Sequence, residues 1–197
     1  ITVLFAILVT GTKAPGMPAI AAETMRPGAK MMHSHPEITA DVLQKQQAMG
    51  EKFGPIFVII LIPIMAMLTG LVLWLVGKIF ESKQTGTAAL MVATYAFFPK
   101  LLASVAGALI AYFSNPDRLN GMTRLSVGFG AFLDPDKTSP LLLALLVRVD
   151  VFTIWETVLL GIGLSITGKI PKAQAYAAAA IVWLIGALPG VLGALRG

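Results

Sequence analysis

Long runs without a charged residue constrain this chain more than any other feature. One run extends from Pro55 to Gly77 and another from Ala173 to Leu195, and two further apolar stretches lie between them. About 20 helical residues match the roughly 30 Å hydrocarbon core of a bilayer, and a soluble protein of this size has no place for several such segments. The sequence therefore predicts an all-α, polytopic integral membrane protein that folds as a helical bundle.

Composition supports this fold class and excludes others. Hydrophobic residues make up 56% of the chain and charged residues 13%, and the charged share is about half of that usual in soluble domains. The chain has 15 basic and 10 acidic residues, which give a formal net charge of +5. The basic residues are scattered singly, whereas nucleic-acid-binding proteins gather them on one face. We therefore expect the lipid bilayer as a partner and no nucleic acid. Because there is no cysteine, thiolate and disulfide chemistry are also excluded.

The chain divides into three parts. Residues 1–11, ITVLFAILVTG, are too short to span and are expected to be the end of a truncated first helix, although a signal peptide has a similar apolar core. Residues 12–52 are expected to form an extramembrane loop, rich in Pro and Gly, with a short amphipathic helix that begins after Thr39. Residues 53–197 are expected to form a four-helix membrane domain, so that the total is about five spans.

Proline and charge positions refine the membrane domain. Its spans are expected at residues 53–78, 87–113, 150–168 and 173–195. The second of these should bend or break near Pro99 and Lys100, because proline removes a helical hydrogen bond. Residues 140–147 are apolar but too short to cross, which predicts a helix lying at the interface or dipping into it.

Orientation follows from the lysines of the short turns. With five spans, both short turns lie on one side and both long loops on the other. The turns contain Lys78, Lys83, Lys169 and Lys172 against a single acid, Glu81. The positive-inside rule weighs basic residues in short loops, so lysine density predicts cytoplasmic turns and external long loops. The raw number of basic residues, which is higher in the long loops, does not favour this orientation.

Three stretches of the chain resemble a known family. They are YAFFPKLL at Tyr95 to Leu102, GAFLDPDKTSPLLLALL at Gly130 to Leu146, and DVFTIWETVLLGIGLS at Asp150 to Ser165. In order and spacing they resemble the bacterial branch of the Yip (Ypt-interacting protein) domain family. The resemblance covers roughly Phe53 to the C-terminus and implies five membrane helices, no enzymatic site and no cofactor. Eukaryotic relatives act in vesicle trafficking with Rab-type GTPases, and some bacterial members sit beside ABC-type efflux systems.

Four charged residues lie within or against apolar sequence: Lys100, Arg148, Asp150 and Glu156. A charge in mid-helix costs about 2.5 to 3.5 kcal/mol on insertion scales unless it is paired or reaches water. At 1.5 Å per residue, Lys100 lies roughly 20 Å from the Phe113 end of its stretch, while Glu156 lies about 9 Å from Asp150 at the same side. A direct pair between Lys100 and Glu156 is therefore expected to need staggered helices or an outstretched lysine.

These charges have two interpretations. Lys100, Asp150 and Glu156 could form an ion or substrate path, or they could fix the packing of the helices. We favour packing, because a transporter usually offers more polar groups inside the membrane and a repeat of broken helices, and the sequence has no clear internal repeat.

Small residues predict close helix packing. Gly161 and Gly163 lie in the span expected at residues 150–168. The span expected at residues 173–195 contains Gly186, Gly190 and Gly193, and the first two of these form a GxxxG pair on one helical face. This pattern is common in membrane helices, and it does not distinguish packing within the chain from packing against a partner.

One loop motif could bind a metal. The sequence MMHSH places His33 and His35 beside two methionines, and soft sulfur with nitrogen donors suits Cu(I). Such a cluster in a flexible loop is more often incidental. The chain contains no H-E-x-x-H, no G-x-S-x-G and no phosphate-binding loop, so no catalytic constellation is predicted.

The sequence thus predicts a non-enzymatic protein of the bacterial inner membrane that acts as an interaction or assembly subunit of a larger membrane complex. Its expected partners are other membrane protein subunits, and an accessory role beside an ABC-type transporter is a narrower form of the same hypothesis. The alternative is a small transporter or channel that uses Lys100 and Glu156.

Overall fold

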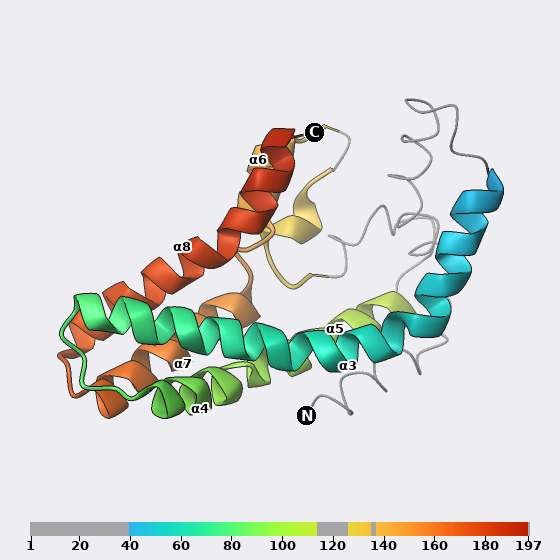
Figure 1. Cartoon of the computed structure of the whole chain (residues 1–197). Helices are drawn as coiled ribbons and strands as arrows, with labels where there is room; N and C mark the ends of the chain where they lie inside the picture. Colours follow the sequence, from blue (N-terminus) through green and yellow to red (C-terminus); the bar gives the residue numbers. More distant parts are fainter. Residues whose placement is uncertain (1–39, 114–125, 135–136, 197) are drawn as a thin grey trace.

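The computed structural model describes residues 40–113, 126–134 and 137–196, and these residues fold into helices without a named strand. In chain order the elements are α3 (Ala40–Ile79), α4 (Gly86–Ala96), α5 (Phe98–Phe113), the short 3-10 helix η3 (Phe129–Phe132), α6 (Pro140–Leu146), α7 (Val151–Gly168) and α8 (Lys172–Arg196) (Figure 1). An isolated antiparallel bridge joins Gly128 to Asp150.

Four segments are long and apolar enough to cross a membrane, namely Ile60–Ile79, Gly86–Gly107, Val151–Gly168 and Lys172–Leu195. Most of their large apolar side chains face outward, as expected of helices whose solvent is lipid. The prediction of an all-helical membrane bundle is confirmed. The truncated first helix expected at residues 1–11 lies outside the described residues.

The spans pack so that both short turns lie at one end of the bundle. Helix α4 packs between α3 and α7, and α8 packs against α7 and α3. The turn after α3 and the turn before α8 meet at the left of Figure 1, and the backbone N–H of Lys83 donates to the carbonyl of Gly168 at 2.9 Å. Because successive spans cross the membrane in opposite directions, the predicted order of spans also places these two turns on the same side.

Neutral polar side chains reinforce this end of the bundle. Ser82 and Gln84 are buried, and the Gln84 side-chain amide donates to the Thr167 hydroxyl at 2.6 Å. The Gln84 backbone N–H donates to the Ser82 hydroxyl at 3.1 Å. Because a buried polar group is costly unless it is hydrogen-bonded, these contacts fix the relative positions of the two turns.

Alanines and branched aliphatic side chains form the centre of the bundle. The buried core consists of Leu73, Val76, Ala93, Ala96, Leu160, Leu164, Ile170, Ala175, Ala178, Ala179 and Val182. Alanines let helix backbones approach closely, and dispersion contacts then replace the hydrophobic driving force that is absent in lipid. The backbones of α3 and α4 approach closely at Gly70, where a Cβ atom would lie 2.9 Å from the Cα atom of Leu90.

Two prolines shape the spans. The helical run that begins at Gly86 is interrupted at Phe97, two residues before Pro99, so the predicted break is confirmed. Helix α8 contains Pro189, which cannot donate to the carbonyl of Ile185, and Figure 1 shows α8 changing direction partway along its length. The outer part of α8 packs against α6, the short helix expected at residues 140–147.

Helix α3 is longer than the span expected at residues 53–78. The segment expected as a separate short helix is the first part of α3, and Figure 1 shows this part set at an angle to the remainder. Its location on the membrane surface stays a prediction.

The glycine contacts generate a stability prediction. A Cβ atom on Gly163 would lie 2.8 Å from Cγ2 of Val92, whereas a Cβ atom on Gly193 would meet nothing within 4 Å. We expect Gly163→Ala to lower the free energy of unfolding by about 1 to 3 kcal/mol, because overpacking forces α4 and α7 apart. The matched control Gly193→Ala should be neutral or slightly stabilising. Thermal unfolding in detergent measures both, and equal effects would contradict the described packing.

Topology generates a second prediction. Because the chain has no cysteine, single cysteines can report sidedness, and the exposed residues Lys83, Lys172 and Lys137 are suitable positions. Ser82 is unsuitable because it is buried between the turns. We expect an impermeant thiol reagent to label Lys83→Cys and Lys172→Cys from one side of sealed vesicles and Lys137→Cys from the other. Labelling of all three from the same side would contradict the arrangement of the spans.

Candidate functional site

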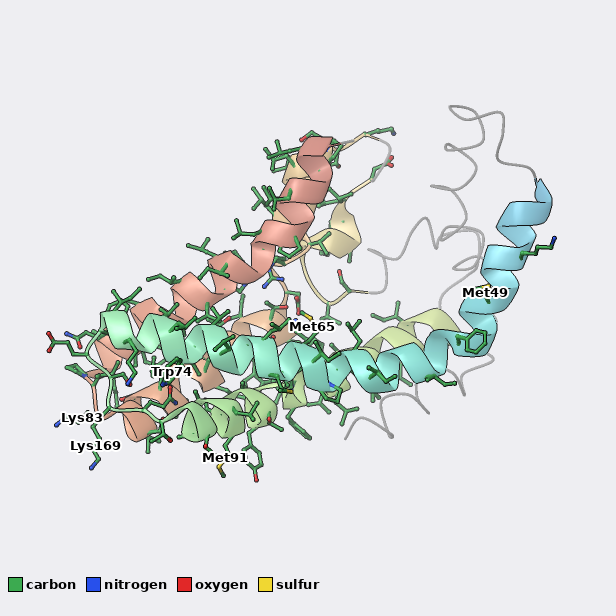
Figure 2. All side chains as sticks on the ribbon, viewed as in Figure 1. Met49, Met65, Trp74, Lys83, Met91 and Lys169 are labelled. Atoms are coloured by element: carbon green, nitrogen blue, oxygen red, sulfur yellow. The ribbon has the colours of Figure 1, made fainter. Side chains whose placement is uncertain are left out.

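The bundle contains a cavity with charged groups at one part of its wall. Its volume is about 330 Å³, and helices α3, α5, α7 and α8 line it together with the residues that precede α7. Most of the lining is apolar, from residues such as Leu61, Met65 and Leu160. The charged part of the lining consists of Lys100, Arg148 and Glu156. Figure 2 shows Met65 pointing from α3 toward the side on which α6 and the outer part of α8 lie.

An ion pair across two helices forms the centre of this charged part. The Nζ atom of Lys100 on α5 lies 3.4 Å from a carboxylate oxygen of Glu156 on α7. The Glu156 side chain is 13% exposed and the Lys100 side chain 37%. Since an unpaired charge in hydrocarbon is costly, each group offsets the cost of burying the other.

Thr153 and Asp150 extend the pair toward the start of α7. The Lys100 ammonium also donates to the buried Thr153 hydroxyl at 2.6 Å, and this hydroxyl donates in turn to the Asp150 carboxylate. The other Asp150 oxygen accepts from the backbone N–H groups of Phe152 and Thr153 at 2.9 and 3.0 Å. Asp150 thus caps α7, where a carboxylate is favoured both as an acceptor and by the helix dipole.

The helix break brings Lys100 to Glu156. Lys100 stands near the start of α5, just after the interruption at Phe97, and α5 packs against α7. In Figure 1, α5 continues beyond the start of α7. The two helices are therefore staggered, which is one of the two conditions expected for a direct pair between Lys100 and Glu156.

Arg148 approaches the same cavity from the segment between α6 and α7. One terminal nitrogen donates to the backbone carbonyl of Trp183 at 3.3 Å, and the guanidinium carbon lies 5.8 Å from the centroid of the Trp183 ring, within cation–π range. Gly186, one helical turn further along α8, makes room for it: a Cβ atom there would lie 2.9 Å from the guanidinium.

Burial and charge act on Arg148 in opposite directions. Burial lowers the pKa of the Arg148 guanidinium from its ordinary value, and the carboxylates of Glu156 and Asp150 oppose this shift. Arginine starts from so high a pKa that it keeps its charge in proteins. Arg148 also lines a second cavity of about 300 Å³, together with Lys100 and Asp150. It therefore borders two cavities.

The predicted packing glycines fall into two groups. Gly161 lies against the ring of Tyr176, where a Cβ atom would come within 2.8 Å of Cε1, and Gly163 lies against Val92. In contrast, Gly190 has only the Cβ atom of Ala144 at an ordinary distance of 3.8 Å, and Gly193 has open space. The GxxxG pair on α8 therefore has unequal roles: Gly186 accommodates Arg148, and Gly190 is not closely packed within the chain.

His33 and His35 lie outside the described residues, so metal binding at MMHSH stays a prediction. In the described part of the chain, no group of three or more His, Cys, Asp or Glu residues is arranged to hold a metal ion.

Sequence reasoning missed the partners of Arg148 and the polar contacts between the turns. Trp183 and Gly186 are three residues apart and share a face of α8, a signal that could have indicated a site for a cation. Gln84 and Thr167 carry no comparable signal, because polar residues near turns are ordinary. The break before Lys100, the segment before Arg148 and the start of α7 correspond to the three stretches that carry the family resemblance.

Comparison with known proteins identifies the family of this chain. The model of a family described as the Yip1 domain matches residues 1–193. Neither the curated proteins nor the solved structures that were compared include a match to this chain.

The charged part of the cavity generates a prediction about coupling. Lys100–Glu156 and Lys137–Asp134 have similar separations, 3.4 and 3.5 Å, but the second pair is far more exposed, at 85% and 36%. One double-mutant cycle combines Lys100→Met with Glu156→Gln, and the other combines Lys137→Met with Asp134→Asn. We expect a coupling free energy on the order of 1 kcal/mol or more in the first cycle and below about 0.5 kcal/mol in the second.

The reason is that removing one partner of a shielded pair leaves the other charge uncompensated, whereas removing both does not. Thermal unfolding of the four variants of each cycle in the same detergent measures the coupling. Additive effects of Lys100→Met and Glu156→Gln would show that their contact does not stabilise the bundle.

Proposed function

Since this chain belongs to the Yip1 domain family of membrane proteins, we propose that it is an interaction or assembly subunit of a larger membrane complex and that it acts without catalysis. The observation that carries the proposal is that the groups most suited to chemistry or transport are engaged in holding the fold. Lys100 bonds to Glu156 and Thr153, and Asp150 caps α7 and accepts from Thr153. Helix packing is the role that these bonds support.

The outer surface of the bundle supports the same proposal. Large apolar side chains are exposed along all four spans, for example Leu71 on α3, Met91 on α4, Ile166 on α7 and Leu188 on α8. In a bilayer such faces are available both to lipid and to the helices of other subunits. An accessory role beside an ABC-type efflux system is the narrower form of this proposal, suggested by the bacterial relatives of the family.

We further propose the bacterial inner membrane as the location, with the short turns in the cytoplasm. Lys83, Lys169 and Lys172 are exposed at the end of the bundle where the turns meet, and Figure 2 shows Lys83 and Lys169 projecting from that end. Lysines beside short turns favour the cytoplasmic side by the positive-inside rule.

One observation favours the alternative, a small transporter. The cavity beside Lys100 and Glu156 has about 330 Å³ of space, at the lower end of the range for small-molecule sites. A transport path would need these two charges themselves, whereas an assembly subunit would need only the packing that they provide.

The deciding experiment removes both charges together. In the double variant Lys100→Met/Glu156→Gln, no buried partner is left alone, and we expect the host complex to form and to keep at least about half of its activity. The control is Lys137→Met/Asp134→Asn, which removes an exposed pair of the same charges. Mass spectrometry of the complex purified from gently solubilised native membranes identifies the other subunits and measures assembly.

A transporter would give the opposite result. It would purify as a homo-oligomer without other subunits, and its flux in proteoliposomes would vanish in Lys100→Met/Glu156→Gln while the control kept it. That combination would replace the proposal with the alternative.

A further inference from the structure

Arg148 is a permanent charge whose donors are mostly unused. A guanidinium has five N–H donors. Among the described residues, the only hydrogen bond of this side chain runs to the carbonyl of Trp183, and its buried Nε atom has no partner. The described part of the chain supplies no ion pair to Arg148. The neighbouring carboxylates are engaged elsewhere, Asp150 at the start of α7 and Glu156 with Lys100.

The surroundings of Arg148 are amphipathic. It lines the cavity of about 330 Å³ whose remaining wall includes Leu61, Ile62 and Met65 of α3 and Leu160 of α7. Leu61 and Met65 are 38% and 44% exposed, so this part of the wall is open to the surroundings of the bundle. A ligand for this cavity therefore needs a negatively charged polar end and an apolar chain.

We propose that the cavity binds a membrane phospholipid, with Arg148 holding the phosphate and the apolar wall receiving the start of an acyl chain. A guanidinium presents a planar fork of donors that matches phosphate oxygens, and such charge-assisted bonds are among the strongest in proteins. This inference goes beyond the proposed subunit role and does not depend on it.

The depth of Arg148 suits a lipid headgroup. Helix α7 has 18 residues, so it is roughly 27 Å long and nearly matches the hydrocarbon thickness. Arg148 stands three residues before the first residue of α7, at the end where the bilayer changes from hydrocarbon to headgroups. A lipid phosphate lies at this level without leaving its own leaflet.

The size of the cavity argues against a protein segment as the occupant. A helix with side chains is about 10 to 12 Å in diameter and cannot enter a space of about 330 Å³. A single chain with a small polar end can enter it, and its path from the lipid passes Leu61 and Met65.

The test compares ligands that share parts of a phospholipid. The delipidated protein in detergent receives dioleoyl phosphatidylglycerol, dioleoylglycerol or inorganic phosphate, and native mass spectrometry and thermal unfolding report binding. We expect the phospholipid to be retained and to raise the unfolding temperature, and the other two compounds to do neither. An equal effect of dioleoylglycerol would overturn recognition of the phosphate. An equal effect of inorganic phosphate would reassign the site to a free anion.

Variants locate the site. Arg148→Met should weaken retention of the phospholipid roughly tenfold or more, because it removes the charge-assisted bonds. The matched control Lys137→Met, at an exposed basic residue, should not weaken it. Unchanged retention by Arg148→Met would overturn the proposal.

A second variant covers the case in which Arg148→Met does not fold. Met65→Trp fills the apolar part of the cavity and leaves every charge in place, and we expect it to reduce retention by a similar factor. Unchanged retention would overturn the proposal. A photo-crosslinker at Leu61 should capture phospholipid in native membranes, and reproducible capture of a subunit of the host complex in its place would assign the cavity to protein contact.

Discussion

A charge placed inside this bundle is costly unless it finds a partner, because hydrocarbon supplies none. The contact between Lys100 and Glu156 meets this requirement, and it has consequences along the chain. Lys100 reaches Glu156 because the helical run breaks at Phe97. The Thr153 hydroxyl accepts from Lys100 and donates to Asp150, whose other oxygen caps α7. These linked polar contacts thus connect the break between α4 and α5 to the start of α7.

The two ends of the bundle are held in different ways. At the end of the short turns, the contacts of Ser82, Gln84 and Thr167 are neutral and enclosed, and the backbones of the turns bond directly. At the other end, long charged side chains bridge the helices and leave two cavities beside them. The buried alanines between the ends require close backbone approach. The charged end therefore has the two larger of the described cavities, and with them space for a ligand.

The sequence was sufficient for features that depend on one segment at a time. Long apolar stretches located the four described spans, and Pro99 indicated the break before α5. Features that depend on two segments could not be derived in this way. The pairing of Lys100 with Glu156 depends on how far α5 extends past α7, and Gly163 differs from Gly193 only through what lies opposite. The contact of Arg148 with Trp183 joins residues 35 positions apart, which no local pattern encodes.

The two cations of the charged cluster differ in a way that separates structure from ligand binding. A satisfied ion pair in a protein interior is replaceable by well-packed apolar residues at little cost, so Lys100 and Glu156 are explained once they have each other. Arg148 has no such partner among the described residues, and unlike lysine it cannot escape the cost of burial by losing its proton. Its Nε atom is buried without a partner, and its terminal nitrogens lie in a space that Gly186 keeps open. The unmet donors of Arg148 raise the free energy of the empty cavity relative to an occupied one, so they favour the proposed binding of a phospholipid.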